Sequence, residues 1–138
     1  MRGRIWLLVI LCALAEQCFA QPIKAPSFPM DTPMRMRAIE AVCTGVGEDA
    51  RNDPRWKNNP LRVEVVGTKG EYLGEAQVTV TLNDEALASV NCAGPWVLFA
   101  LVPGTYTVSA ELAGTSRMSK VNVSASGQAR VILRLPSE

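Results

Sequence analysis

The chain contains no histidine, the side chain that most often serves as a general acid or base. Adjacent pairs of carboxylates are therefore the remaining candidates for acid/base chemistry. Without histidine, Ser-His-Asp and Cys-His nucleophile systems and most zinc sites are excluded. Glu48 with Asp49, and Asp84 with Glu85, are the candidate pairs for acid/base work on glycosides. Each pair lies in a turn-like stretch where solvated charge is the ordinary role. We therefore predict no catalytic residue and no enzymatic activity.

The sequence contains only incomplete motifs for a metal site or a phosphate site. Asp49 and Asp53 supply carboxylates at a short spacing, but the stretch lacks the dense repeat of oxygen ligands found in an EF-hand. The segment 44–47, Thr-Gly-Val-Gly, superficially resembles a phosphate-binding loop but lacks its third glycine and its Lys-Ser/Thr ending. We expect a turn there, and no metal ion or cofactor.

Two cysteines favour a covalent link between distant parts of the chain. Cys43 and Cys92 are 49 positions apart and remain once an N-terminal leader is removed. In an exported protein such a pair most simply forms one disulfide, which stabilises the fold by about 4 kcal/mol. The alternative is a redox-active or metal-binding thiol, but the chain has no Cys-x-x-Cys pair. We predict the disulfide.

The N-terminus has the three parts of a secretory signal peptide. Arg2 and Arg4 precede an apolar run from Ile5 to Ala15, and small residues end the segment at Ala20. The run is about half the length that a membrane-spanning helix needs. We expect cleavage after Ala20, a periplasmic or secreted protein, and no stable membrane insertion.

The charge balance disfavours two classes of binding partner. Without residues 1–20 the chain keeps twelve basic and twelve acidic side chains, so its net charge is close to zero. A neutral chain gives no electrostatic reason to bind nucleic acid or an anionic membrane. The expected partner is an unidentified envelope protein or polysaccharide.

Two regions precede the main domain. Four prolines between positions 21 and 33 predict an extended, loosely held arm over 21–37. The next stretch is ambiguous, because Met36, Ile39 and Cys43 have helical spacing while 39–43 equally suits a short strand, which we favour. A short helix is expected over 48–56, cut by Pro54.

From Leu61 onward the apolar residues repeat with a period of two, which is typical of strands. Alternation gives each strand one buried and one solvated face, whereas 96–102 is apolar throughout and suits a central strand covered on both faces or one edge of the core. We predict an all-β domain over 38–138: a seven-stranded antiparallel β-sandwich with a short irregular or partly helical N-terminal segment. Its expected strands are 61–65, 77–82, 86–92, 96–102, 105–112, 116–123 and 129–135.

The aromatic residues divide into structural and surface candidates. Trp96 is expected at the edge of the core, and the Tyr106 hydroxyl is expected to fasten the turn around Pro103 and Gly104, as a tyrosine corner does. Gly104 is expected to need a backbone conformation closed to branched residues. Trp56 and Tyr72 lie in polar, loop-like stretches and are the candidate surface contacts; the plainer alternative is that they pack the N-terminal segment onto the sandwich.

Four segments together resemble a known family: 45–51, 72–80, 93–98 and 101–108, the last containing Pro-Gly-Thr-Tyr-Thr-Val. They are similar to small exported bacterial proteins with a carboxypeptidase regulatory-like domain, the transthyretin-related sandwich attached to metallocarboxypeptidases. The resemblance spans roughly 45–136. It implies a seven-stranded, non-catalytic sandwich, because the peptidase's zinc and catalytic residues belong to a separate domain. It transfers no site residue.

The resulting hypothesis is a non-catalytic binding or accessory module that contacts another envelope protein or polymer. It predicts an exposed patch with Trp56 and Tyr72, or an unpaired edge strand that accepts a partner strand. The alternative is a carbohydrate-binding module, which requires exposed, coplanar aromatics at Trp56 or Trp96. A hydrolase of transthyretin-like descent is disfavoured because such chemistry relies on histidine.

Overall fold

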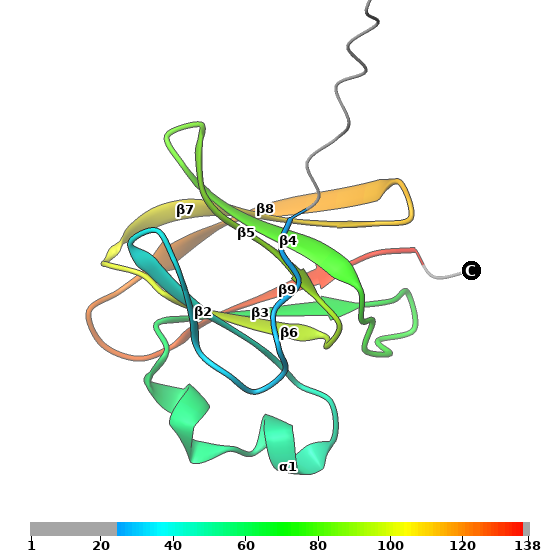
Figure 1. Ribbon diagram of the computed structural model, residues 1–138. Helices are drawn as coiled ribbons and strands as arrows, with labels where there is room; N and C mark the ends of the chain where they lie inside the picture. Colours follow the sequence, from blue (N-terminus) through cyan, green and yellow to red (C-terminus); the bar gives the residue numbers. More distant parts are fainter. Residues whose placement is uncertain (1–24, 137–138) are drawn as a thin grey trace, which may run out of the picture.

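Residues 25–136 are described by the structure, a computed structural model, and form two β-sheets with a short helical segment beside one of them (Figure 1). The predicted signal peptide, 1–20, lies outside the described residues. Within the described part, no helix has the length and apolar character needed to cross a membrane.

The strands divide into a five-stranded and a four-stranded sheet. All neighbouring strands are antiparallel except β3 and β9, which pair in parallel. In spatial order the first sheet contains β1 (Met34–Met36), β2 (Ile39–Thr44), β6 (Trp96–Ala100), β3 (Leu61–Val66) and β9 (Ala129–Arg134). The second contains β5 (Glu85–Cys92), β4 (Ala76–Leu82), β7 (Gly104–Leu112) and β8 (Thr115–Val123).

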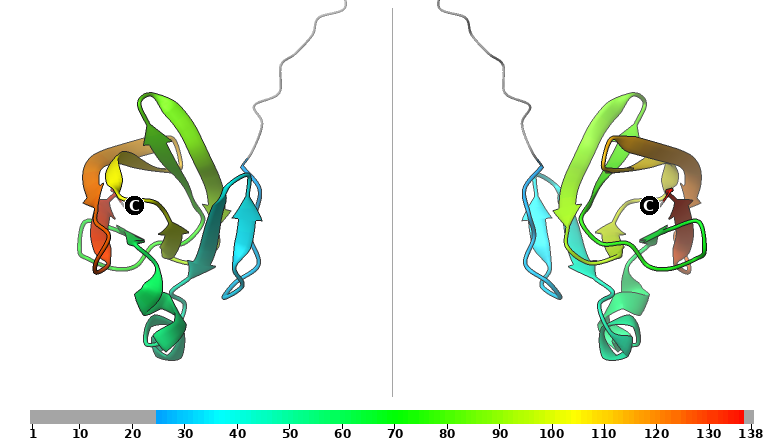
Figure 2. Two further views of the ribbon diagram at one scale, coloured as in Figure 1. Left: turned by 90° about the vertical axis from the view of Figure 1, so that its left-hand side faces the viewer. Right: turned by 90° about the vertical axis from the view of Figure 1, so that its right-hand side faces the viewer.

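The main core lies between the two sheets (Figure 2). Because successive side chains of a strand point to opposite faces, each strand contributes alternate residues to it. The alternation predicted from the sequence is confirmed in β4, β7 and β9, for example by Val131 and Leu133 inside and Arg130 and Arg134 outside. The largest fully buried apolar side chains of this core are Phe99, Leu61 and Leu135.

Two tight hairpin turns join neighbouring strands of the four-stranded sheet. Asn83 and Asp84 join β4 to β5 with φ of 49° and 64°, and Ala113 and Gly114 join β7 to β8 with φ of 50° and 79°. Two consecutive residues with positive φ give the turn whose twist matches that of the strands it joins. These turns fix the register of both hairpins.

A second, smaller core lies on the outer face of the five-stranded sheet. The helix α1 (Glu48–Arg51) and the 3₁₀ helix η1 (Pro54–Asn58) lie beside this face (Figure 1). Trp56 of η1 packs with Val42 of β2 and Leu98 of β6. This explains why β6 is apolar throughout: it is a central strand covered on both faces.

The N-terminal segment is held more firmly than the sequence suggested. Ser27 pairs with Asn91 of β5, Met30 pairs with Cys43 of β2, and Phe28 is only 9% exposed. The expectation of a loosely held arm is therefore wrong for this stretch, because backbone hydrogen bonds to β5 and β2 and the burial of Phe28 dock it onto the sheets. The predicted disulfide between Cys43 and Cys92 is present beside it, with Cα atoms 5.5 Å apart.

The predicted count of seven antiparallel strands needs correction, because the described residues contain nine strands and one parallel pairing. All seven strands expected from Leu61 onward are found, and the strand favoured over 39–43 is β2. The additional β1 has three residues, too few to show a period in the sequence. The parallel pairing of β3 with β9 depends on how distant strands meet, which local patterns do not encode.

Candidate functional site

The two predicted contact residues have different environments. Trp56 is 4% exposed and belongs to the outer core, with the Arg55 guanidinium 4.5 Å above its ring. Tyr72 is 43% exposed. The structure thus supports the packing alternative for Trp56 and leaves Tyr72 at the surface. The polar sequence around Trp56 suggested an exposed side chain. In the structure Arg55 and Lys57 are exposed, while the indole between them is buried.

The tryptophans also remove the basis of the carbohydrate-binding alternative. Trp56 and Trp96 are 4% and 5% exposed. Tyr72 meets the Trp96 ring edge-on, at 78° between planes and 6.1 Å between centroids. Sugar stacking needs an open aromatic face, and neither tryptophan offers one.

The least expected feature of the sheet is a fully buried carboxylate, Glu64, on the outer face of β3. Alternation had placed this side chain on a solvated face. Arg130 of β9 donates hydrogen bonds to both carboxylate oxygens, and the Tyr72 hydroxyl donates to Oε1 at 3.3 Å. Arg62 Nε lies 3.3 Å from Oε2, at ion-pair distance but without hydrogen-bond geometry.

The parallel register explains why Glu64 is needed. Arg62 of β3 stands directly opposite Arg130 of β9, and like charges in that position repel. Glu64 lies between them and compensates both. Its hydrogen bonds raise the pKa of Arg130 above its already high ordinary value. The same face continues into a layer of stacked cations, with Arg62 4.5 Å above the Trp96 ring and Arg51 5.2 Å above Tyr72.

Sequence reasoning missed this network of Arg62, Glu64, Tyr72 and Arg130. The only signal was the spacing of Arg62 and Glu64 on one face of a strand, which also fits two solvated residues. Chemically, the network holds charges in place: the carboxylate already accepts hydrogen bonds from an arginine and a tyrosine. It therefore positions β3, β9 and the loop carrying Tyr72.

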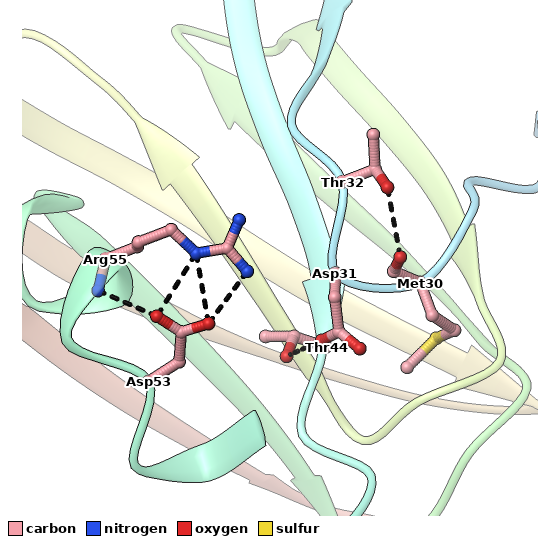
Figure 3. A network of polar contacts seen from close by, with 6 residues as sticks. All are labelled: Met30, Asp31, Thr32, Thr44, Asp53 and Arg55. Atoms are coloured by element: carbon pink, nitrogen blue, oxygen red, sulfur yellow. Dashed lines mark hydrogen bonds and ion pairs between the residues drawn. The ribbon is translucent and has the colours of Figure 1, made fainter. Parts of the chain in front are cut away.

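The predicted carboxylate pairs are separate and exposed. Glu48 and Asp49 occupy the first turn of α1, and Asp84 with Glu85 lies at the β4–β5 turn. Asp53 accepts hydrogen bonds from the backbone and side chain of Arg55 (Figure 3). These bonds lower the pKa of Asp53, and the side-chain bond has the largest effect. Among residues 25–136 no cluster of three or more His, Cys, Asp or Glu side chains could hold a metal ion.

Figure 3 also shows how the N-terminal segment is fastened near η1. The buried Thr44 hydroxyl donates to Asp31 Oδ1 at 2.5 Å, and the backbone N–H of Asp31 donates to the carbonyl of Cys43 at 2.8 Å. These bonds attach the segment directly to the end of β2.

The predicted turn at Pro103, Gly104 and Tyr106 is partly as expected. The Tyr106 hydroxyl donates to the carbonyl of Val102 at 2.6 Å, which confirms its role in fastening the turn. The reason given for Gly104 is wrong: its φ is outside the left-handed region, and an added Cβ would meet the Tyr106 ring at an ordinary 3.5 Å. Gly104 is simply the first residue of β7.

The two edges of the four-stranded sheet differ. At one edge, β5 receives the N-terminal segment, with Asn91 donating to the carbonyl of Pro26 and accepting from Phe28. At the other edge, β8 pairs with β7 along nine residues, and no strand in the described part of the chain pairs with its outer side. One edge thus pairs with the chain's own N-terminal segment, whereas the outer edge of β8 is free of backbone pairing, with β9 of the other sheet beside it.

A groove of about 470 Å³ runs between β8 and β9. The two strands lie side by side at the side of the molecule opposite the N-terminal strands (Figure 2). Met118 and Ile132 expose 70% and 47% of their surfaces, and Arg117 and Arg134 flank them. Arg134 is fixed by donating to the carbonyls of Gly67 and Thr68.

Comparison with protein-family models finds no match to this chain, and comparison with curated proteins finds none.

Proposed function

We propose that the protein is a non-catalytic exported binding module that holds an extended segment of another envelope protein on the free edge of β8. The observation that carries this proposal is the combination of an unpaired nine-residue edge with the groove beside it. An unpaired edge offers backbone N–H and C=O groups to an incoming strand, and side pockets then select its side chains.

The fold already uses backbone pairing at a sheet edge. Residues 26–28 bond to Asn91 at the edge of β5, so the same sheet accepts added chain on its other side. In the groove, Met118 and Ile132 supply apolar contact and Arg117 and Arg134 supply positive charge, while Lys120 adds a further exposed cation along β8. These properties suit a partner strand in which apolar and acidic residues alternate.

The cations also bear on self-association. Charged residues on edge strands hinder pairing between copies of a protein, because like charges meet. Arg117 and Lys120 would therefore oppose β8-to-β8 pairing while attracting an acidic strand. The edge is selective for a partner with the opposite charge.

The compartment and family are part of the same proposal. The N-terminal sequence supports export to the periplasm or beyond, and a near-neutral chain favours neither nucleic acid nor a membrane surface. The two sheets and the bond from Tyr106 to Val102 support a relationship to carboxypeptidase regulatory-like domains of the transthyretin-related type. Strands β3 to β9 would correspond to the seven strands of that sandwich.

The test compares Met118→Glu and Ile132→Glu with Val46→Glu, a control at an exposed apolar residue of a distant loop. Each protein is immobilised, envelope proteins are captured, and amide hydrogen exchange is measured with the purified partner. We expect wild type and the control to retain the partner and β8 amides to exchange at least tenfold more slowly. Retention by both groove variants, or binding without protection of β8, contradicts the proposal.

A further inference from the structure

A second hollow lies on a different face, between the helical segment and the outer surface of the five-stranded sheet. Its volume is about 390 Å³, and its walls include Trp56 and Trp96. Gln128 closes one side by donating to the carbonyls of Trp56 and Asn59, at 2.7 and 3.0 Å. These bonds hold η1 against the loop before β9 and fix the position of Trp56.

Both tryptophans carry a buried indole N–H with no hydrogen-bond partner among the described protein atoms. Buried donors are nearly always paired in folded proteins, because an unpaired donor loses its hydrogen bond to water and gains none in return. Here two such donors, from β6 and η1, belong to side chains lining the same cavity. Both nitrogens are covered by protein atoms, so a ligand that accepts hydrogen bonds reaches them only when exposed side chains at the rim, Asn52 and Lys57, move aside.

The charges around the cavity specify the kind of acceptor. Arg51, Lys57 and Arg62 line it, and its one acidic lining residue, Asp53, is already engaged by Arg55. Behind Arg62, Glu64 accepts both hydrogen bonds of Arg130. The lining therefore has an excess of positive charge.

Arg62 is also held in advance of binding. Its guanidinium lies above the Trp96 ring and close to Glu64, while its side chain remains 24% exposed. A planar guanidinium fixed in this way loses little freedom when it donates to two oxygens of one group. Lys57 and Asn52 at the rim are exposed, so their side chains can move aside to admit a ligand.

We propose that this cavity binds the oxyanion of a small organic molecule, a carboxylate or a phosphate ester, through Arg62, Lys57 and the two indole N–H groups. The volume is near the lower end for ligand pockets and is larger than a bare ion requires. The site is independent of the β8 edge, so the failure of either proposal leaves the other intact.

The test follows the indole N–H signals of ¹⁵N-labelled protein by NMR, assigned with Trp56→Phe and Trp96→Phe. Sodium benzoate and sodium phenyl phosphate are the two probes, and sodium chloride at equal ionic strength is the control. We expect both indole signals to shift and saturate at one common Kd with at least one probe. The probe that binds more tightly identifies the carboxylate or the phosphate.

Two variants establish which residues bind. Lys57→Gln changes an exposed side chain, and Arg62→Gln removes the fixed guanidinium; we expect Kd to rise at least tenfold in Arg62→Gln and severalfold in Lys57→Gln. Lys120→Gln on β8 is the matched control and should leave Kd unchanged. Shifts that are equally large with chloride, that do not saturate, or that persist in both variants overturn the proposal.

Discussion

Glu64 shows how one side chain resolves a conflict created by strand pairing. The parallel register places Arg62 opposite Arg130. Without a counter-charge, repulsion between these two side chains would destabilise the pairing of β3 with β9 at this point. A carboxylate between them makes the pairing favourable, at the cost of burying a charge. The side chain is buried because both arginines and Tyr72 cover it.

Replacing Glu64 by Gln should therefore destabilise the protein. The amide keeps the size of the side chain but leaves Arg62 and Arg130 without a counter-charge. We expect a loss of about 2 kcal/mol, below the 3–5 kcal/mol typical of fully buried pairs because Arg130 is 51% exposed and partly screened by water. Urea unfolding measures this loss of stability, and Glu111→Gln, at an exposed residue, is the control. Equal stability of Glu64→Gln and wild type would contradict this role.

Tyr106 should make stability depend on alkaline pH. Burial raises the pKa of the Tyr106 hydroxyl above its ordinary 10.0, because the charged phenolate is poorly solvated. The contribution of the neutral hydroxyl is complete below pH 10 and is lost as pH rises through the folded-state pKa. Tyr106→Phe should cost about 1 kcal/mol at neutral pH and reduce the alkaline loss. Thermal unfolding across this range tests both expectations, and an unchanged alkaline profile in the variant would refute the second.

At the scale of elements, the α1–η1 segment acts as a cover for β2 and β6. Its two helices are too short to be stable alone, since a helix gains stability only beyond several turns. The segment is held by the burial of Trp56 against Val42 and Leu98, and by Gln128. The cover and the cavity beneath it therefore depend on one indole.

Trp56→Ala should destabilise the protein by about 3–5 kcal/mol, the usual cost of truncating a buried tryptophan. The reason is the cavity left above Val42 and Leu98. Guanidinium unfolding measures the change, and Val46→Ala, at a residue 63% exposed, is the control that should alter stability by less than about 0.5 kcal/mol. A Trp56→Ala protein as stable as the control would restore the surface role first expected of this residue.

Sequence patterns predicted the strand positions but not the burial of individual polar or loop residues. Period-two alternation located the strands from Leu61 onward because one face of each must be apolar. The turns at Asn83-Asp84 and Ala113-Gly114 also have a local cause, because Asn, Asp and Gly adopt positive φ more readily than other residues. Glu64 and Trp56 could not be placed, because their burial depends on residues far away in the sequence: Arg130 for the first, and Val42 with Leu98 for the second.

On the scale of the whole molecule, the two long sides differ. On one side the N-terminal segment runs from β5 to β2, and the Cys43–Cys92 disulfide joins those strands. On the other side the groove separates β8 from β9. The covalent link and the docked N-terminal segment therefore lie on one side of the molecule, and the groove lies on the other.

Replacing both Cys43 and Cys92 by Ser should lower the free energy of unfolding by about 4 kcal/mol, through the chain entropy that the link removes from the unfolded state. We also expect faster hydrogen exchange at Phe28 and Asp31, whose backbone bonds lie beside the link. Thermal unfolding and exchange mass spectrometry measure the two effects, and treating wild type with reductant should reproduce them. A stability loss without faster exchange in the segment would show that the link does not hold it.

The parallel pairing of β3 with β9 has a consequence for biogenesis. Leu61–Val66 is synthesised more than sixty residues before its neighbour Ala129–Arg134. Until β9 emerges, one edge of β3 is unpaired and Glu64 lacks Arg130. The incomplete sheet can therefore aggregate until the final strand is synthesised, and a chaperone that shields β3 during this interval would increase the yield of folded protein.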